Sequence, residues 1–204
     1  MRTLQQPLFT PETEWVPPDR LPDLSSYKEI AIDLETRDPS LTTMGSGAVR
    51  REGEVVGIAI AVEGWSGYFP IAHEGGGNMD RYLVLDWFEE VLHTTSTKIF
   101  HNAMYDVSWI RSLGFQINGG IVDTMVAASL CNENRYSYTL DSVAKEYVGM
   151  GKNEKLLQEA AKDWGINPKA EMWRLPAPFV GEYAEKDAEI TLKLWGAMQH
   201  EISK

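Results

Sequence analysis

Two carboxylates follow a short apolar run near the start of this sequence. Asp33 comes directly after the run, and Glu35 stands two residues later. Because residues i and i+2 of an extended chain project to the same face, these side chains would converge. Like charges so close together raise the pKa of one group unless a cation neutralises them. Most acidic pairs are simply solvated, but this one stands where a strand would end, and it predicts a site for Mg²⁺ or Mn²⁺.

The helical pattern places two more acids among apolar residues. Asp106 falls on the apolar stripe of a helix predicted at residues 103–113, and Asp187 lies in the middle of the stripe of the last helix, residues 178–199. A buried acid is costly unless its charge is compensated. Tyr183 precedes Asp187 by one turn, so its hydroxyl could hold a water molecule beside a metal-binding carboxylate. The plainer alternatives are a hydrogen-bonded core aspartate and a core tyrosine with a hydrated tip.

One arrangement accounts for all three segments. The carboxylates of Asp33, Glu35, Asp106 and Asp187 would surround two divalent cations. Such a cluster suits phosphoryl transfer, in which two ions about 3.5–4 Å apart hold the attacking and leaving oxygens. The four acids therefore predict metal-dependent phosphodiester chemistry.

The same segments resemble the motifs of a known family, the DEDD 3′–5′ exonucleases of the tyrosine subclass (DEDDy, DnaQ-like). In chain order the motifs are Asp33-Leu34-Glu35-Thr36, Asn102-Ala103-Met104-Tyr105-Asp106 and Tyr183-Ala184-Glu185-Lys186-Asp187. Further stretches are similar to the proofreading exonuclease domain of phage-type family A DNA polymerases, and these are residues 35–39, 123–128 and 137–144. The resemblance covers residues 28–199 and implies an RNase H-like fold.

The resemblance also implies a role for each motif residue. Asp33 would bridge both cations, and Glu35 and Asp187 would complete the first metal site. Asp106 would anchor the second cation, mostly through water. Glu35 would also meet the terminal 3′ hydroxyl, and Tyr183 would orient the water that attacks. The product would be a nucleoside 5′-monophosphate.

Residues near the motifs are expected to bind the substrate. Asn102 would contact the terminal nucleotide, with Thr36 and Tyr105 beside it. Either Leu41 or Met44 would place an apolar wedge against the last base, and stacking of this kind tolerates any base. His101 could line the same site, although a histidine that only satisfies local hydrogen bonds is the plainer interpretation.

The periodicity predicts an α/β domain with a mixed sheet of about five strands, an antiparallel meander first, and helices on both faces. The strands are expected at residues 29–33, 55–62, 67–71, 98–100 and 121–122, and the helices at 80–92, 103–113, 123–130, 139–148, 154–164, 168–173 and 178–199. Residues 37–53 are expected to form a long loop, and residues 75–78 a flexible one. We predict an extended N-terminal arm at residues 1–26 and the exonuclease domain at 27–204.

Composition limits the class of protein. The 204 residues are 43% hydrophobic, carry a formal net charge of −11 and include one cysteine, Cys131. These values exclude a disulfide framework and argue against a duplex binder with a basic face. No apolar run reaches the roughly 18 residues of a membrane span. We expect a protein of the bacterial or phage-infected cytoplasm that acts on the 3′ end of single-stranded DNA, away from membranes.

Several alternatives remain open at the level of sequence. The chain could be a free-standing enzyme or one piece of a longer polymerase, with a polymerase domain or subunit as its partner. An exonuclease of the same family that trims RNA 3′ ends would carry the same motifs. A catalytically silent nucleic-acid-binding module could retain the fold, but the presence of all four acids and Tyr183 argues against it.

Overall fold

Five strands form one mixed sheet in the order β3-β2-β1-β4-β5 in the computed structural model, which describes residues 12–151 and 154–202. The strands are β1 (Glu29–Arg37), β2 (Glu54–Val62), β3 (Trp65–Pro70), β4 (Thr97–Phe100) and β5 (Ile121–Asp123). β1, β2 and β3 pair antiparallel, and β4 and β5 continue the sheet in parallel with β1. The predicted α/β sheet with an antiparallel meander first is confirmed.

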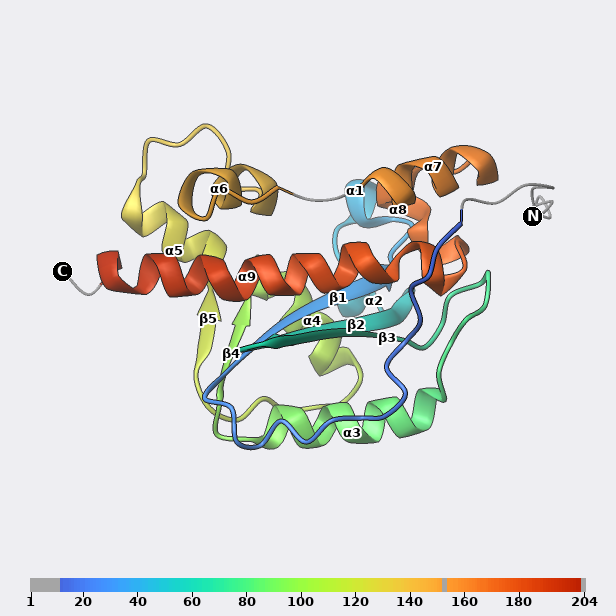
Figure 1. Ribbon diagram of the computed structural model, residues 1–204, viewed down its shortest axis with the longest axis horizontal. Helices are drawn as coiled ribbons and strands as arrows, with labels where there is room; N and C mark the ends of the chain where they lie inside the picture. Colours follow the sequence, from blue (N-terminus) through green and yellow to red (C-terminus); the bar gives the residue numbers. More distant parts are fainter. Residues whose placement is uncertain (1–11, 152–153, 203–204) are drawn as a thin grey trace.

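Helices cover both faces of this sheet, with α9 on one side and α3 on the other (Figure 1). The helices are α1 (Leu41–Met44), α2 (Gly47–Arg50), α3 (Arg81–His93), α4 (Ala103–Ser112), α5 (Thr124–Cys131), α6 (Leu140–Tyr147), α7 (Lys155–Trp164), α8 (Pro168–Glu171) and α9 (Gly181–Ile202). Two 3₁₀ turns, η1 (Met172–Arg174) and η2 (Ala177–Phe179), lead into α9. Within the described residues, no helix is long and apolar enough to span a bilayer.

The alternation of side chains along β1 assigns the acids to one face. Ile30, Ile32 and Leu34 join the core against α3 and α4, whereas Ala31 packs in the core beneath α9. Because side chains alternate along a strand, Asp33 and Glu35 share the face of Ala31. The strand that carries the first two acids therefore points them toward α9.

Small residues on the α9 face of β2 leave room for larger groups. Ala59 pairs with Asp33 on one side and with Tyr68 on the other, and Gly57 pairs with Glu35. A Cβ atom added to Gly57 would lie 2.0 Å from the Tyr68 hydroxyl. Glycine is therefore required at this position so that the tyrosine can lie across the sheet next to the acids.

The end of β1 and the segment after it differ from the prediction, and β3 (Trp65–Pro70) and α9 (from Gly181) also begin at other residues than predicted. β1 does not end at Asp33 but continues to Arg37, because β2 pairs with it as far as Glu54 and so extends the strand through polar residues. The connection after Arg37 is not an irregular loop throughout, since α1 and α2 form single helical turns within it.

The glycine-bearing segment after β3 is packed, contrary to the predicted flexible loop. The Glu74 amide donates to the Trp173 carbonyl at 2.9 Å, and the Ala177 amide donates to the Gly76 carbonyl at 2.9 Å. A Cβ atom on Gly75 would meet the backbone nitrogen of Pro176 at 2.3 Å. The glycines therefore permit close contact with the segment that leads into α9.

The described part of the N-terminal segment contacts α9 and α3. The Thr13 hydroxyl donates to the Pro178 carbonyl at 3.3 Å, and the Trp15 indole N–H donates to Glu185 at 2.9 Å. Further along, the Trp87 indole N–H of α3 donates to the Pro22 carbonyl at 2.8 Å. Residues 1–11 of the predicted arm lie outside the described residues.

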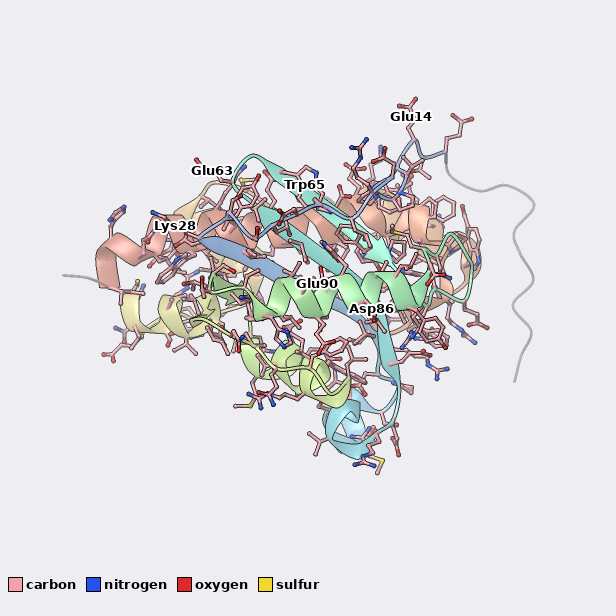
Figure 2. The ribbon with its side chains drawn as sticks, turned by 90° about the horizontal axis from the view of Figure 1, so that it is seen from below. Glu14, Lys28, Glu63, Trp65, Asp86 and Glu90 are labelled. Carbon is pink, nitrogen blue, oxygen red and sulfur yellow. The ribbon has the colours of Figure 1, made fainter. Side chains whose placement is uncertain are left out.

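Lys98 of β4 is fully buried, and we expect its replacement to destabilise the fold. Its ammonium donates to the carbonyl oxygens of Thr94, Ser96 and Asn118 at 2.6–3.1 Å, and burial lowers the pKa of Lys98 to about 8. Lys98→Met would leave these acceptors unpaired, at a cost of about 2–3 kcal/mol in the free energy of unfolding. Urea unfolding would measure this loss. The exposed Lys28, labelled in Figure 2, offers the control Lys28→Met, and equal stability of the two variants would contradict the assignment.

Candidate active site

Helix α4 brings its acid against β1. The Asp123 carboxylate accepts from the backbone amides of Asn102 at 3.0 Å and Ala103 at 2.8 Å, and so caps the start of α4. One helical turn on, the buried Asp106 carboxylate accepts from the Leu34 amide at 3.0 Å. Since Leu34 lies between Asp33 and Glu35, Asp106 is held beside both. Asp123 also accepts from the Met125 amide and so caps the start of α5 as well.

Helix α9 brings the remaining two residues over the same face. Tyr183 and the buried Asp187 lie on the side of α9 that packs on the sheet. Glu185, between them in sequence, accepts from the Tyr68 amide at 3.1 Å and from the Trp15 indole. This carboxylate therefore fixes α9 to the edge strand β3, which sets the distance between helix and sheet.

The electrostatics identify one cluster. Burial raises the pKa of Asp106 well above its ordinary value, and the charges of Asp33 and Glu35 raise it further. Burial likewise raises the pKa of Tyr183, together with the charges of Asp187, Glu35 and Asp33 and a hydrogen bond to Asp187. The structure thus brings the four predicted acids and Tyr183 together from β1, α4 and α9. Mutual repulsion among buried carboxylates is what a bound cation would relieve.

The donor atoms suit a hard cation. The cluster offers carboxylate oxygens only, which Mg²⁺ and Mn²⁺ prefer over sulfur or imidazole ligands. In residues 12–151 and 154–202, however, no group of three or more His, Cys, Asp or Glu side chains is arranged so that it could hold a metal ion. The acids therefore converge without forming closed coordination, and cation binding would require them to draw closer than they lie here.

Two predicted substrate contacts belong to an internal hydrogen-bond network. The Tyr105 hydroxyl lies 2.7 Å from the Thr36 hydroxyl and donates to Asp38 at 3.3 Å. Burial raises the pKa of Tyr105 to about 12, so this hydroxyl stays protonated at neutral pH. These contacts fix α4 against the end of β1, and a role of Thr36 and Tyr105 in substrate binding stays a prediction.

Asp38, which no sequence pattern singled out as a site residue, organises the segment that carries the predicted wedge. Its carboxylate accepts from the Gly47 amide at 3.0 Å and lies 4.0 Å from the Arg50 guanidinium. Arg50 in turn donates to the Met44 carbonyl at 2.8 Å, which ties down the end of α1. Leu41 is 41% exposed and Met44 is 64% exposed, so both α1 side chains can reach a ligand. The choice between them stays open.

Asn102 and His101 have structural tasks. Asn102 adopts a left-handed backbone (φ 69°), which asparagine tolerates better than most residues. Both ring nitrogens of His101 are engaged, Nδ1 at 2.9 Å from the Thr124 hydroxyl and Nε2 at 2.9 Å from the Tyr138 carbonyl. The hydrogen bonds of His101 agree with its plainer interpretation, and the predicted nucleotide contacts of both residues stay predictions.

A buried tyrosine–histidine pair beside the acids was also missed. The Tyr68 hydroxyl lies 2.6 Å from His73 Nε2, and His73 Nδ1 lies 3.0 Å from the Leu175 carbonyl. Because a carbonyl only accepts, Nδ1 carries the proton and Tyr68 donates to Nε2. Burial and then the charges of Glu35 and Asp33 raise the pKa of Tyr68. The pair therefore connects the acid-bearing face of the sheet to the segment before α9.

We expect His73 to make stability fall in acid. Burial lowers the pKa of His73 from 6.5 to about 4, so below about pH 6.5 the unfolded chain binds a proton that the folded chain excludes. This linkage removes about 3 kcal/mol from the free energy of unfolding between about pH 7 and pH 4. Urea unfolding across this range should show a smaller loss for His73→Gln. The exposed His93 supplies the control His93→Gln, and identical pH profiles for parent and His73→Gln would refute the assignment.

The chain is similar to known 3′–5′ exonuclease domains and to solved nuclease structures. A family model described as 3′–5′ exonuclease matches residues 13–203. The DNA-directed DNA polymerase of Pseudomonas phage M6 is 40% identical over an alignment of 212 positions, which covers 100% of this chain and 32% of that polymerase. Trypanosoma brucei RNase D superposes with a TM-score of 0.62 at 21% identity, over 86% of this chain and 58% of that one. Brucella melitensis NrnC with bound Mg²⁺ superposes with a TM-score of 0.59 at 19% identity, over 89% of this chain and 76% of that one.

The mixed sheet and these likenesses define an RNase H-like fold of the kind found in DEDD exonucleases, as the sequence predicted. The chain belongs to the 3′–5′ exonuclease family, whose model matches nearly its whole length. It spans only 28–32% of the length of the phage polymerase relatives that it matches.

Proposed function

We propose that this chain hydrolyses phosphodiester bonds at the 3′ end of single-stranded or frayed DNA, depends on divalent cations and releases nucleoside 5′-monophosphates. The observation that supports it most directly is the convergence of Asp33, Glu35, Asp106, Asp187 and Tyr183 from β1, α4 and α9. The mutually repelling charges of the four acids, of which Glu35, Asp106 and Asp187 are buried, favour a site that binds cations and then an anionic backbone.

Each residue has a distinct task in this proposal. The four carboxylates would hold the cations, and Glu35 would also contact the terminal 3′ hydroxyl. The cations, when bound, would activate water and neutralise charge on the phosphate that is attacked. Tyr183, whose raised pKa keeps it protonated, cannot take a proton from the water, so its hydroxyl would orient the water by hydrogen bonding.

The relatives suggest a setting for this activity. Phage DNA polymerases contain a region similar to 90–100% of this chain, which supports proofreading next to a polymerase domain or subunit in the infected bacterial cytoplasm. The solved structures include ribonucleases, but at about 20% identity they establish the fold alone. DNA is thus favoured as the substrate.

The test compares matched DNA and RNA oligonucleotides labelled at the 5′ end. With Mg²⁺ or Mn²⁺ we expect a ladder of DNA products shortened from the 3′ end, and with EDTA intact DNA. Faster shortening of RNA than of DNA would assign the chain to RNA trimming. Intact DNA and RNA with either cation would identify a binding module without catalysis.

A further inference from the structure

Two arginines lie over one indole ring near the end of β1. The guanidinium carbon of Arg37 is 5.4 Å from the centroid of Trp173, and that of Arg174 is 5.2 Å from it. Cations over an aromatic face are attracted by its quadrupole and held in orientation. Trp173 and Arg174 belong to η1, which contacts β1 and leads toward α9. We call these three side chains the arginine clamp.

The arginine clamp lies on the face that carries the acids. Arg37 follows Glu35 by two residues on β1, past a register shift between Glu35 and Thr36, and its contact with Trp173 places it on the side of η1 and α9. At about 3.3 Å per residue, the Cα atoms of Glu35 and Arg37 are about 7 Å apart. In a chain with a net charge of −11, these two arginines bring guanidinium donors next to the acids, although each also contacts carboxylates of its own.

The guanidinium of Arg37 retains unused donors. Its Nε lies 3.4 Å from a Glu54 oxygen in an ion pair, but this N–H is buried and makes no hydrogen bond. A guanidinium has five N–H donors, and a buried donor without an acceptor is costly. Glu54 is also shared with Arg81, at 3.5 Å, so it does not neutralise Arg37 alone. The Arg37 side chain is 40% exposed, which leaves it accessible to a ligand.

Arg174 is held by two carboxylates other than the one that pairs with Arg37. It donates to Glu171 at 2.8 Å, and its Nε lies 3.6 Å from Glu74 in an ion pair without a hydrogen bond at that nitrogen. Surface ion pairs contribute little to stability, so these contacts orient the side chain more than they stabilise the fold. The remaining donors of both guanidiniums suit an acceptor with several oxygens, and a phosphate group is such an acceptor.

We propose that the arginine clamp binds the sugar–phosphate backbone of the strand whose 3′ end lies at the carboxylate cluster. This inference rests on the proposed function and adds a binding site to it. Arg37 and Arg174 contact phosphate oxygens upstream of the bond that is cleaved, and Trp173 holds both guanidiniums in place. Backbone contacts carry no sequence information, which suits an enzyme that removes any nucleotide.

The test uses Arg37→Gln and Arg174→Gln, with Arg81→Gln as the matched control. Arg81 shares Glu54 with Arg37 but belongs to α3, on the opposite face of the sheet. Each clamp variant should raise KM about fivefold to tenfold without changing kcat, because a charged hydrogen bond to bound substrate is lost in ground and transition states alike. The control should match the parent in both constants.

Binding gives a second readout. In an Asp106→Asn background with Mg²⁺, fluorescence anisotropy would follow a labelled oligothymidylate of about a dozen nucleotides. Each clamp variant should reduce the slope of log affinity against log salt by about 0.7, the value for one phosphate contact with a single strand. An abasic oligonucleotide of the same length should show the same reduction. If the reduction disappears with the abasic probe, the arginines contact bases and the phosphate assignment is wrong.

The outcomes separate the two proposals. Suppose that the parent cleaves DNA, and that Arg37→Gln and Arg174→Gln show the same KM and the same salt slope as Arg81→Gln. This result would overturn the arginine clamp alone. A parent that neither cleaves nor binds oligonucleotides would overturn the proposed function together with it. Trp173→Phe keeps an aromatic ring under the guanidiniums and should retain most of the affinity for the oligonucleotide. A loss of affinity equal to that of Arg37→Gln would show that binding depends on the indole itself and not on the placement of the two cations.

Discussion

Replacing Asp106 by asparagine should reduce DNA cleavage on the order of a thousandfold, the scale seen when a preorganised group that stabilises charge is removed from an active site. Asparagine keeps the size and the acceptor oxygen of Asp106, so the hydrogen bond from the Leu34 amide can persist. What is lost is a negative charge that would bind a cation. The rate of 3′ shortening of a 5′-labelled oligonucleotide with Mg²⁺ measures the effect.

The same variant should be more stable than the parent when no metal is present. Because the folded-state pKa of Asp106 lies above its ordinary value of 3.8, ionising this group destabilises the fold increasingly as pH rises above that value. Thermal unfolding in EDTA near neutral pH should therefore show a higher melting temperature for Asp106→Asn. Asp86, exposed on α3 in Figure 2, supplies the control Asp86→Asn, which should alter neither property. Full cleavage by Asp106→Asn would refute a role for this acid in catalysis.

Replacing Tyr183 by phenylalanine should slow cleavage about a hundredfold and leave metal binding intact, because positioned proton-transfer and water-orienting groups contribute about that much. The ring remains in the core beneath α9, and only the hydroxyl that meets Asp187 is removed. Single-turnover cleavage measures the rate, and the rise of melting temperature with Mg²⁺ measures metal binding.

The exposed Tyr82 allows a matched control for this substitution. Tyr82→Phe removes a hydroxyl from a side chain that is 80% exposed on α3, and it should cleave like the parent. A Tyr183→Phe variant that cleaves at the parent rate would show that the hydroxyl has no part in placing water. Loss of the Mg²⁺-dependent stabilisation would instead show that Tyr183 supports the metal ligands.

Local patterns in the sequence were sufficient to find the acids. Asp106 and Asp187 each interrupt an apolar helical stripe, and this periodicity also located α4 and α9 within a few residues. The alternation in β1 placed Asp33 and Glu35 on one face although the predicted end of the strand was wrong. Side-chain periodicity depends only on the local backbone, which is why it can be read without knowing the fold.

Other features depend on partners far away in the chain. Lys98, His73 and Asp38 have buried polar side chains that form hydrogen bonds with backbone groups. Every residue type carries such backbone groups, so these partners cannot be recognised from the sequence. The length of β1 depends on its pairing with β2. The contact between Arg37 and Trp173 depends on how η1 packs against β1 before α9 begins.

The sequence by itself determined which residue types could bind cations and on which faces of their own elements they stand. Only the tertiary structure decided that these faces meet, and that Asp106 sits against the Leu34 amide rather than in a separate core. The physical reason is that periodicity is local, whereas the meeting of β1, α4 and α9 follows from packing helices on both faces of one sheet.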